Sequence, residues 1–207
     1  ASHQGEIDYT SKMVQPHVAG IINIGTAHLG EFGGRDGICR AKSEIYAHIS
    51  ETSIIPAADD FAQTIRAAVK TEKSLSFGAG GEVYASDMVL EAQSSSFTLN
   101  TPQGSKTVRL PFAGEHNVEN ATAAAAFALA IGINLDDIVA GLEQAVGAKG
   151  RLNFIPHKDY LFIDDTYNAN PGSMRAAAEV LAQQQGIRIM VTGDIGELGS
   201  SAAIEHY

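Results

Sequence analysis

A short segment rich in polar side chains follows a predicted strand near the end of the chain. It reads Asp-Asp-Thr-Tyr-Asn-Ala-Asn-Pro over residues 164–171. Ligands of open α/β sheets bind outside the carboxyl ends of strands, and carboxylates placed there can accept hydrogen bonds from ribose hydroxyls. Asn168 or Asn170 could instead cap the helix that Pro171 opens. Two adjacent carboxylates, a tyrosine and two asparagines exceed what a turn requires, which favours a binding site.

Lys42 is a candidate for metal chemistry. It lies four residues after Ile38 and three before Ile45, on the apolar face of the helix expected over residues 35–49. Desolvation there favours the neutral amine, which can add carbon dioxide to form a carbamate, an anionic oxygen ligand suited to Mg²⁺. The alternative is a lysine whose stem covers the core while its ammonium reaches water, and the spacing alone favours that alternative.

His28 lies in a glycine-rich loop, residues 25–34, that follows the first predicted strand. A histidine at the carboxyl end of a strand could ligate a metal ion or contact phosphate. It could equally be a loop histidine that makes one backbone hydrogen bond. Position alone leaves both interpretations open.

Two asparagines stand at the start of the alanine-rich helix expected over residues 117–131. Asn117 is predicted to be the N-cap, and Asn120 lies three residues on, near the same face. Carboxamides at these positions can pair with the donor and acceptor edge of adenine. Capping alone explains Asn117 but makes no use of Asn120.

Arg151 follows a predicted linker, residues 147–150. An arginine at the junction between two domains can form a bidentate fork onto phosphate. A surface salt bridge is at least as good an explanation from position alone.

The elements that must position these groups alternate between strand and helix. An apolar run rich in β-branched residues, 18–24, predicts a buried strand of a parallel sheet, and helices are expected over residues 35–49 and 58–69. Alternation from Val83 to Phe112, with a hairpin turn at residues 102–104, predicts an antiparallel patch. We therefore expect an α/β fold with an antiparallel β insertion.

The last part of the chain predicts a strand–helix–strand unit. The strands are expected over residues 160–164 and 187–192, and the helix between them begins at Pro171 and is closed by Gly186. Such a unit has a right-handed crossover. A further helix is expected earlier, over residues 135–146.

Composition limits the possible partners and the compartment. The chain has 207 residues and a formal net charge of −10, which argues against a nucleic-acid partner but not against a nucleotide. A single cysteine allows no internal disulfide and fits a reducing cytoplasm. No apolar run approaches the roughly 20 residues that span a bilayer, so no membrane insertion is expected. No signal peptide opens the chain.

Taken in order, these strings resemble the Mur ligases over nearly the whole chain. The opening Ala-Ser-His-Gln-Gly-Glu-Ile is similar to the segment after the family's metal-binding glutamate. Residues 23–29, 32–33 and 41–45 resemble the metal region of the family's central domain. Residues 114–121 resemble the start of its adenine-contacting helix, and residues 150–152 resemble the hinge into its C-terminal domain. Residues 164–171 and 193–199 resemble the branch of the family that adds D-alanyl-D-alanine.

The resemblance implies two domains. Residues 1–149 would be the central ATP-binding domain, incomplete at its N-terminus, and residues 150–207 the start of a Rossmann-like C-terminal domain. The family's G-x-x-G-K-[ST] phosphate loop and the glutamate expected before Ala1 are absent. The resemblance therefore implies an internal fragment that has no ligase activity alone.

The resemblance also implies roles for the candidate residues. His28 and a carbamylated Lys42 would hold Mg²⁺ and act in catalysis. Asn117 and Asn120 would contact adenine. The remaining candidates would bind the rest of the ATP: Arg151 its phosphates, Asp165 its ribose, and Tyr167 with Asn168 the nucleotide side of a closed cleft.

The implied reaction is ATP-dependent ligation of D-alanyl-D-alanine to UDP-N-acetylmuramoyl-tripeptide through an acyl phosphate, in peptidoglycan precursor synthesis. The full-length enzyme would be a cytoplasmic monomer. One alternative is a related ligase that adds a diamino acid or glutamate, against which the string at residues 164–171 argues. The other is a non-catalytic nucleotide-binding module, supported only by the missing phosphate loop.

Overall fold

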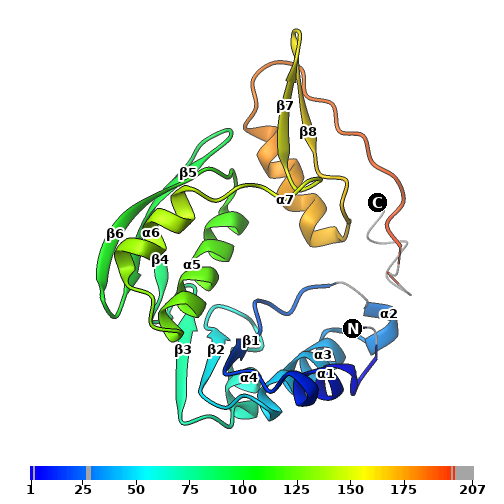
Figure 1. Cartoon of the computed structure of the whole chain (residues 1–207). Coiled ribbons are helices and arrows are strands. Elements are labelled where there is room, and N and C mark those ends of the chain that lie inside the picture. Colours follow the sequence, from blue (N-terminus) through cyan, green and yellow to red (C-terminus); the bar gives the residue numbers. More distant parts are fainter. Residues whose placement is uncertain (2, 27–28, 197, 199–207) are drawn as a thin grey trace.

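A computed structural model describes residues 1, 3–26, 29–196 and 198 of the chain (Figure 1). The first sheet is parallel and has the strand order β1 (Val18–Gly20), β2 (Thr52–Pro56), β3 (Lys73–Phe77). Val18 pairs with Thr52, and Ile54 pairs with Leu75. The predicted parallel sheet is therefore confirmed.

Helices cover both faces of this sheet. On one side lie α1 (Glu6–Val14), α2 (Leu29–Phe32), α3 (Arg35–Ser43), the 3₁₀ helix η1 (Glu44–Ala47) and α4 (Ala62–Ala68). On the other side lies α5 (Glu115–Ala130). Successive strand residues point to opposite faces, so Ile54 joins the hydrophobic cluster that contains Val118 of α5, while Ile55 joins the cluster that contains Ile38 of α3.

The second sheet is the predicted antiparallel insertion. Its strands are β4 (Tyr84–Leu90), β5 (Ser95–Thr101) and β6 (Gly104–Leu110), in that order. The hairpin turn falls at Pro102 and Gln103, as expected. The inward side chains of this sheet, including Phe97 and Leu99, share one core with α5, and α6 (Leu135–Glu143) packs against β6.

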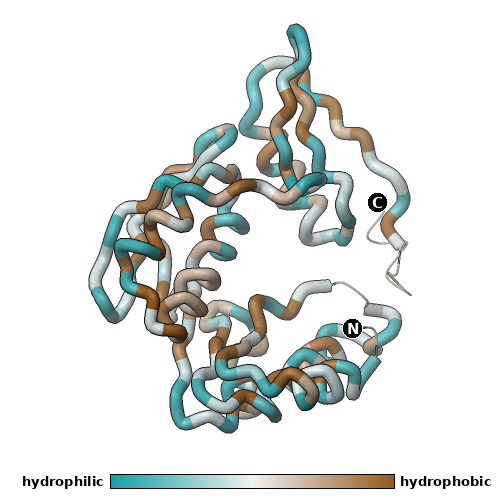
Figure 2. The backbone as a smooth tube through the Cα atoms, in the orientation of Figure 1, coloured by the Kyte–Doolittle hydropathy of each residue, from teal (hydrophilic) through white to brown (hydrophobic). Residues whose placement is uncertain are grey.

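The last part of the chain begins with an antiparallel hairpin of β7 (Asn153–His157) and β8 (Tyr160–Asp164), followed by α7 (Pro171–Ala182). The predicted strand over residues 187–192 is wrong, because this segment forms no strand. Ile187 is 93% exposed and Val191 91%, and hydrophobic stretches colour the segment brown (Figure 2). Its composition suits a strand, but no described strand pairs with it, so the strand–helix–strand unit is not formed among the described residues.

Side-chain hydrogen bonds shorten two predicted elements. The strand expected over residues 18–24 ends at Gly20, because the Ile21 amide donates to the Tyr46 hydroxyl and the Ile24 amide donates to Asp59 instead of to a neighbouring strand. The helix expected from residue 58 begins only at Ala62, because Asp59 accepts from the Phe61 amide and stabilises a turn.

Two other predicted helices also end early. The helix expected over residues 35–49 is α-helical only to Ser43 and continues as η1. The helix that Pro171 opens ends at Ala182 rather than near Gly186. No helix in the described part of the chain is long and apolar enough to cross a bilayer.

Candidate nucleotide and catalytic site

Lys42 lies in the last turn of α3 and turns back toward the end of β1. Its Nζ donates a hydrogen bond to the Asn23 carbonyl oxygen at 2.9 Å. Burial lowers the pKa of this amine, and the carboxylate of Asp59 opposes the shift by stabilising the ammonium. The side chain is half-buried, as the helical spacing predicts for a lysine that shares an apolar face, but its Nζ donates to a main-chain carbonyl, which the spacing did not predict.

The predicted metal site combines Lys42 with His28. His28 lies outside the described residues. Within the described ranges, no group of three or more His, Cys, Asp or Glu side chains gathers closely enough to hold a metal ion. Lys42 as an amine is a hydrogen-bond donor and would become an oxygen ligand only as a carbamate. The described residues therefore do not form a Mg²⁺ site by themselves.

The start of α5 differs from the prediction. Gly114, at φ 91°, is the N-cap, so the predicted N-cap role of Asn117 is wrong. Asn117 lies inside the first turn, and its Nδ2 donates to the Ala113 carbonyl at 2.8 Å. Asn120 is exposed, and its side chain makes no hydrogen bond within the described part of the chain. Of the two carboxamides, that of Asn120 is the more available to a ligand.

His116 marks where α5 meets α7. Its ring is half-buried, and burial lowers its pKa, against the opposing effect of the Asp165 and Glu179 carboxylates. Val180 of α7 is 1% exposed and lies against Gly114. Asp165 is thereby brought near the first turn of α5, which carries Asn117. His116 had no predicted role of its own, because nothing in its spacing distinguishes it from a neighbour of a capping residue.

Three of the predicted residues gather just after the linker. The guanidinium of Arg151 stacks over the Tyr167 ring, 4.2 Å from its centroid. The Tyr167 amide donates to the Gly150 carbonyl at 3.0 Å, and the Leu152 amide donates to Asp165 Oδ1 at 3.1 Å. Gly150 has φ 73°, and a Cβ there would lie 3.1 Å from the Tyr167 nitrogen, so glycine permits this close crossing. Arg151, Asp165 and Tyr167 thus form one constellation.

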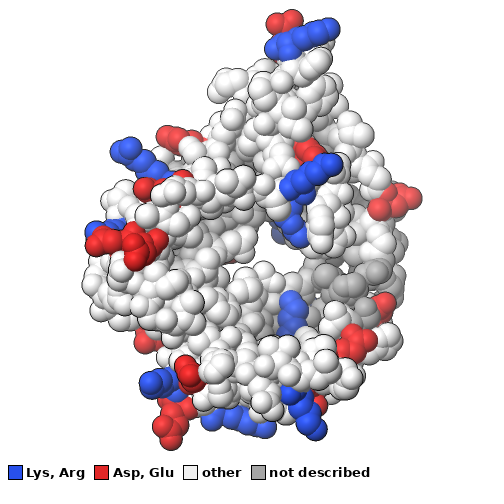
Figure 3. Space-filling model, viewed as in Figure 1, with Lys and Arg blue, Asp and Glu red and all other residues white. Residues whose placement is uncertain are grey.

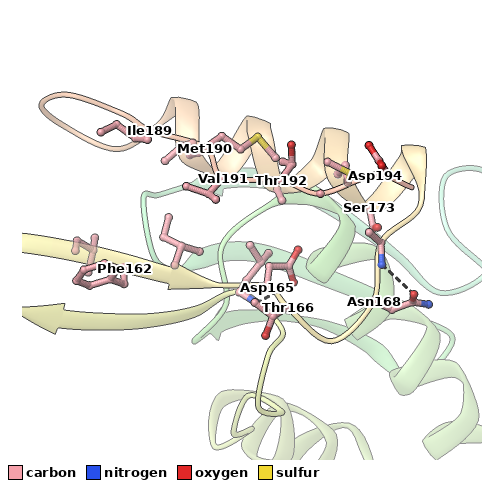
Figure 4. Close-up of a pocket in the computed structure, with 18 residues that line it drawn as sticks. Phe162, Asp165, Thr166, Asn168, Ser173, Ile189, Met190, Val191, Thr192 and Asp194 are labelled. Atoms are coloured by element: carbon pink, nitrogen blue, oxygen red, sulfur yellow. Dashed lines mark hydrogen bonds between the residues drawn. The ribbon is translucent and has the colours of Figure 1, made fainter. Parts of the chain in front are cut away.

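A cavity of about 580 Å³ opens beside this constellation, between β8, α7 and residues 189–194 (Figure 4). Apolar side chains of α7 line it, among them Met174 and Leu181, and polar groups at Asp165, Thr166 and Asn168 border it. A mainly apolar cleft with a few convergent polar groups is typical of a small-molecule site.

Some of the polar side chains beside the cavity already form hydrogen bonds within the turn between β8 and α7. Asp164 Oδ1 accepts from the Thr166 hydroxyl at 2.6 Å, and Asn168 Oδ1 accepts from the Ala169 amide at 2.9 Å. Asn170 is the N-cap of α7 and forms a capping box with Ser173. The capping interpretation therefore holds for Asn170 and not for Asn168, and Asp165 is the carboxylate of the pair that lines the cavity.

The molecular surface is hollowed between the part that carries α7 and the part that carries α3 (Figures 1 and 3). In this view Lys and Arg side chains border the opening on both sides. The chain as a whole is acidic, but the Lys and Arg side chains at this opening can attract phosphate groups locally.

Two models of known protein families match the chain. Residues 1–128 match the family model described as Mur ligase middle domain, and residues 150–207 match the model described as Mur ligase, glutamate ligase domain. The first match alone covers more than half of the chain. The chain belongs to the Mur ligase family.

Individual relatives indicate which branch of the family the chain resembles. UDP-N-acetylmuramoyl-tripeptide--D-alanyl-D-alanine ligase of Haemophilus influenzae is 41% identical, covering 100% of this chain and 46% of the relative. A crystal structure of MurF from Acinetobacter baumannii is 70% identical with a TM-score of 0.97, covering 100% of this chain and 46% of that one. MurF ligase from Thermotoga maritima, solved in complex with ADP, is 28% identical with a TM-score of 0.89, covering 100% and 48%. The chain spans about half the length of the curated relatives it matches.

Proposed function

We propose that this sequence, within a chain of its relatives' full length, catalyses the ATP-dependent ligation of D-alanyl-D-alanine to UDP-N-acetylmuramoyl-tripeptide. The observation that carries the proposal is the similarity of this whole chain to 46% of a MurF crystal structure, at 70% identity and a TM-score of 0.97. The sequence identity supports the reaction class, which a shared fold alone does not determine.

The nucleotide roles follow from which side chains are available. Asn120, exposed on α5, offers both the donor and the acceptor that adenine requires. Arg151 uses the face of its guanidinium on Tyr167, which leaves its N–H edge for phosphate oxygens. Asp165 would accept from ribose hydroxyls, while Asn117, Tyr167 and Asn168 would line the pocket. The ADP in the Thermotoga maritima relative supports a nucleotide here.

The chemistry proceeds in two balanced steps. A carboxylate oxygen of the tripeptide attacks the γ-phosphorus of ATP, forming an acyl phosphate as the bond to ADP breaks. The amine of D-alanyl-D-alanine then attacks the acyl carbon, loses a proton and expels inorganic phosphate. Arginine at the phosphates supplies charge neutralisation, and a closed cleft protects the acyl phosphate from water. The assignment of Mg²⁺ to His28 and a carbamylated Lys42 stays a prediction.

The full-length chain would fold as separate domains joined at a hinge. A central domain over residues 1–149 would meet a C-terminal domain over residues 150–207 at the Gly150–Arg151 hinge. The whole enzyme would act as a cytoplasmic monomer, without a nucleic-acid partner and without membrane insertion.

The test is an acceptor assay on a chain of the relatives' full length that contains these residues. With ATP and UDP-N-acetylmuramoyl-tripeptide, we expect phosphate release and a pentapeptide product with D-alanyl-D-alanine, and neither with a diamino acid or glutamate. Ligation of glutamate or a diamino acid would assign the chain to another branch of the family. ADP binding without any ligation would instead indicate a non-catalytic module.

A further inference from the structure

Three side chains hold the backbone just beyond the end of β1. The Ile24 amide donates to Asp59 Oδ2 at 2.7 Å, and the Ile24 carbonyl accepts from Arg35 Nη2 at 3.0 Å. The preceding carbonyl, that of Asn23, accepts from Lys42 Nζ at 2.9 Å. Both polar atoms of the Ile24 residue are therefore bound by charged groups of opposite sign.

Asp59 and Arg35 are themselves held in place through Phe61. The other carboxylate oxygen of Asp59 accepts from the Phe61 amide at 2.9 Å. The guanidinium of Arg35 stacks over the Phe61 ring, 5.1 Å from its centroid. The four residues Ile24, Asp59, Phe61 and Arg35 thus form a closed ring of contacts, which we name the Ile24 clamp.

The charged partners of the clamp give it more rigidity than a turn between neutral groups. Hydrogen bonds to ionised groups are shorter and roughly twice as strong as neutral ones. Asp59 and Arg35 are partly buried, so water competes less for them than for the neighbouring Asp60, which is exposed. Asp60 meets Arg35 from the solvent side, with the two oppositely charged atoms 2.7 Å apart and an exposed fraction of 74% on the aspartate. An exposed pair of this kind contributes little.

We propose that Asp59 and Arg35 are positioning residues for the ligation. By fixing the Ile24 peptide they fix the adjacent Asn23 carbonyl, against which Lys42 is held at the carboxyl end of a parallel strand. That end of a sheet is where ligands of α/β folds bind. The catalytic consequence rests on the proposed function, whereas the mechanical role of the clamp does not.

Asp60 provides a matched control for Asp59, because the two residues are adjacent and undergo the same change of chemistry. Asp59→Asn removes the charge and one of the two acceptors, whereas Asp60→Asn removes only the solvent-side pair. We expect amide hydrogen exchange at Ile24 to accelerate at least about tenfold in Asp59→Asn and to stay within about twofold in Asp60→Asn. Equal exchange rates in the two variants would show that Asp59 does not restrain the Ile24 amide and would overturn the proposal.

The ligation activity of the full-length chain is a second test of the positioning role. Turnover is expressed per ADP-binding site, so that only folded molecules are counted. In Asp59→Asn it should fall at least about tenfold. The KM for ATP should stay within about threefold, because the proposed adenine contacts lie on α5. Asp60→Asn should match the parent, and normal turnover in Asp59→Asn would refute the positioning role. An inactive parent would contradict the proposed function, yet the exchange measurement would still decide whether the clamp exists.

Arg35→Lys keeps the positive charge and loses the planar fork, so it covers the case in which Asp59→Asn does not fold. We expect Ile24 exchange in this variant to accelerate about threefold to tenfold. Exchange identical to that of the parent would also overturn the proposal.

Discussion

Val180 of α7 packs against Gly114 at the start of α5, so closely that a Cβ on Gly114 would lie 3.1 Å from Val180 Cγ2. Residues 66 positions apart in the sequence thereby join the alanine-rich helix to the segment that carries Asp165. Because the backbone of Gly114 has φ 91°, both its conformation and its surroundings require glycine.

Gly114→Ala should destabilise the fold by about 2–3 kcal/mol, since it combines backbone strain with two close contacts of the added Cβ, to the His116 ring at 2.7 Å and to Val180 at 3.1 Å. Gly132→Ala is the control, because Gly132 also has a positive φ, 85°, but nothing lies within 4 Å of its Cβ position. That variant should lose only about 1–2 kcal/mol. Denaturant unfolding measures both, and an equal loss would show that the contacts around Gly114 add nothing to the cost of its backbone conformation.

The two asparagines of α5 should separate stability from binding. Asn117→Ala loses the hydrogen bond to Ala113, partly offset by the higher helix propensity of alanine, for a net cost of about 0.5 kcal/mol. Asn120→Ala should leave stability unchanged or slightly raised and weaken ADP binding about tenfold. Calorimetric titration of the full-length chain checks the second effect, and unchanged affinity in Asn120→Ala would remove the residue from the adenine site.

His116 should make stability depend on pH. Burial lowers its pKa in the folded state from the ordinary value of 6.5, so below that value the unfolded chain binds the proton more readily. Its contribution is complete above about pH 6.5 and is lost as the pH falls toward the folded pKa, despite the carboxylates of Asp165 and Glu179. His116→Gln should reduce the difference in unfolding free energy between pH 7.5 and 5.5; an undiminished difference would assign it to other groups.

Lys42→Ala should reduce ligation by the full-length chain at least about a hundredfold, and bicarbonate should give no rescue. Lys70→Ala, which alters an exposed lysine after α4, is the control and should retain normal turnover. Normal turnover in Lys42→Ala would exclude both the carbamate role and any need for the amine at this position.

The sequence predicted the elements whose signals are local. The alternation around Phe97 and Leu99 with a turn at Pro102, and the alanine-rich helix ending near Gly132, agree with the structure within a few residues. Hydrophobic periodicity reports on one element and its solvent-facing side, which is sufficient for these. The failed strand at Ile187 shows the limit, because a strand also requires a partner that composition does not reveal.

The candidate site was predictable only where motifs lie within one short segment. Arg151, Asp165 and Tyr167 came from two strings near the linker, and the structure brings them together. The Ile24 clamp was not predicted, because Asp59 accepts a hydrogen bond from a backbone amide that lies 35 positions away in the sequence. A contact between a side chain and a distant main-chain atom leaves no periodic pattern, so nothing in the spacing of Asp59 distinguishes it from an ordinary turn residue.

The alternation of Ile54 and Ile55 on β2 has a consequence for how this region unfolds. The two side chains belong to different hydrophobic clusters, yet they share one peptide bond in the middle strand of the parallel sheet. Fraying of β2 would remove a fully buried side chain from both clusters at once. The helices on the two faces of the sheet therefore gain or lose their order together, as one cooperative unit rather than as two independent layers.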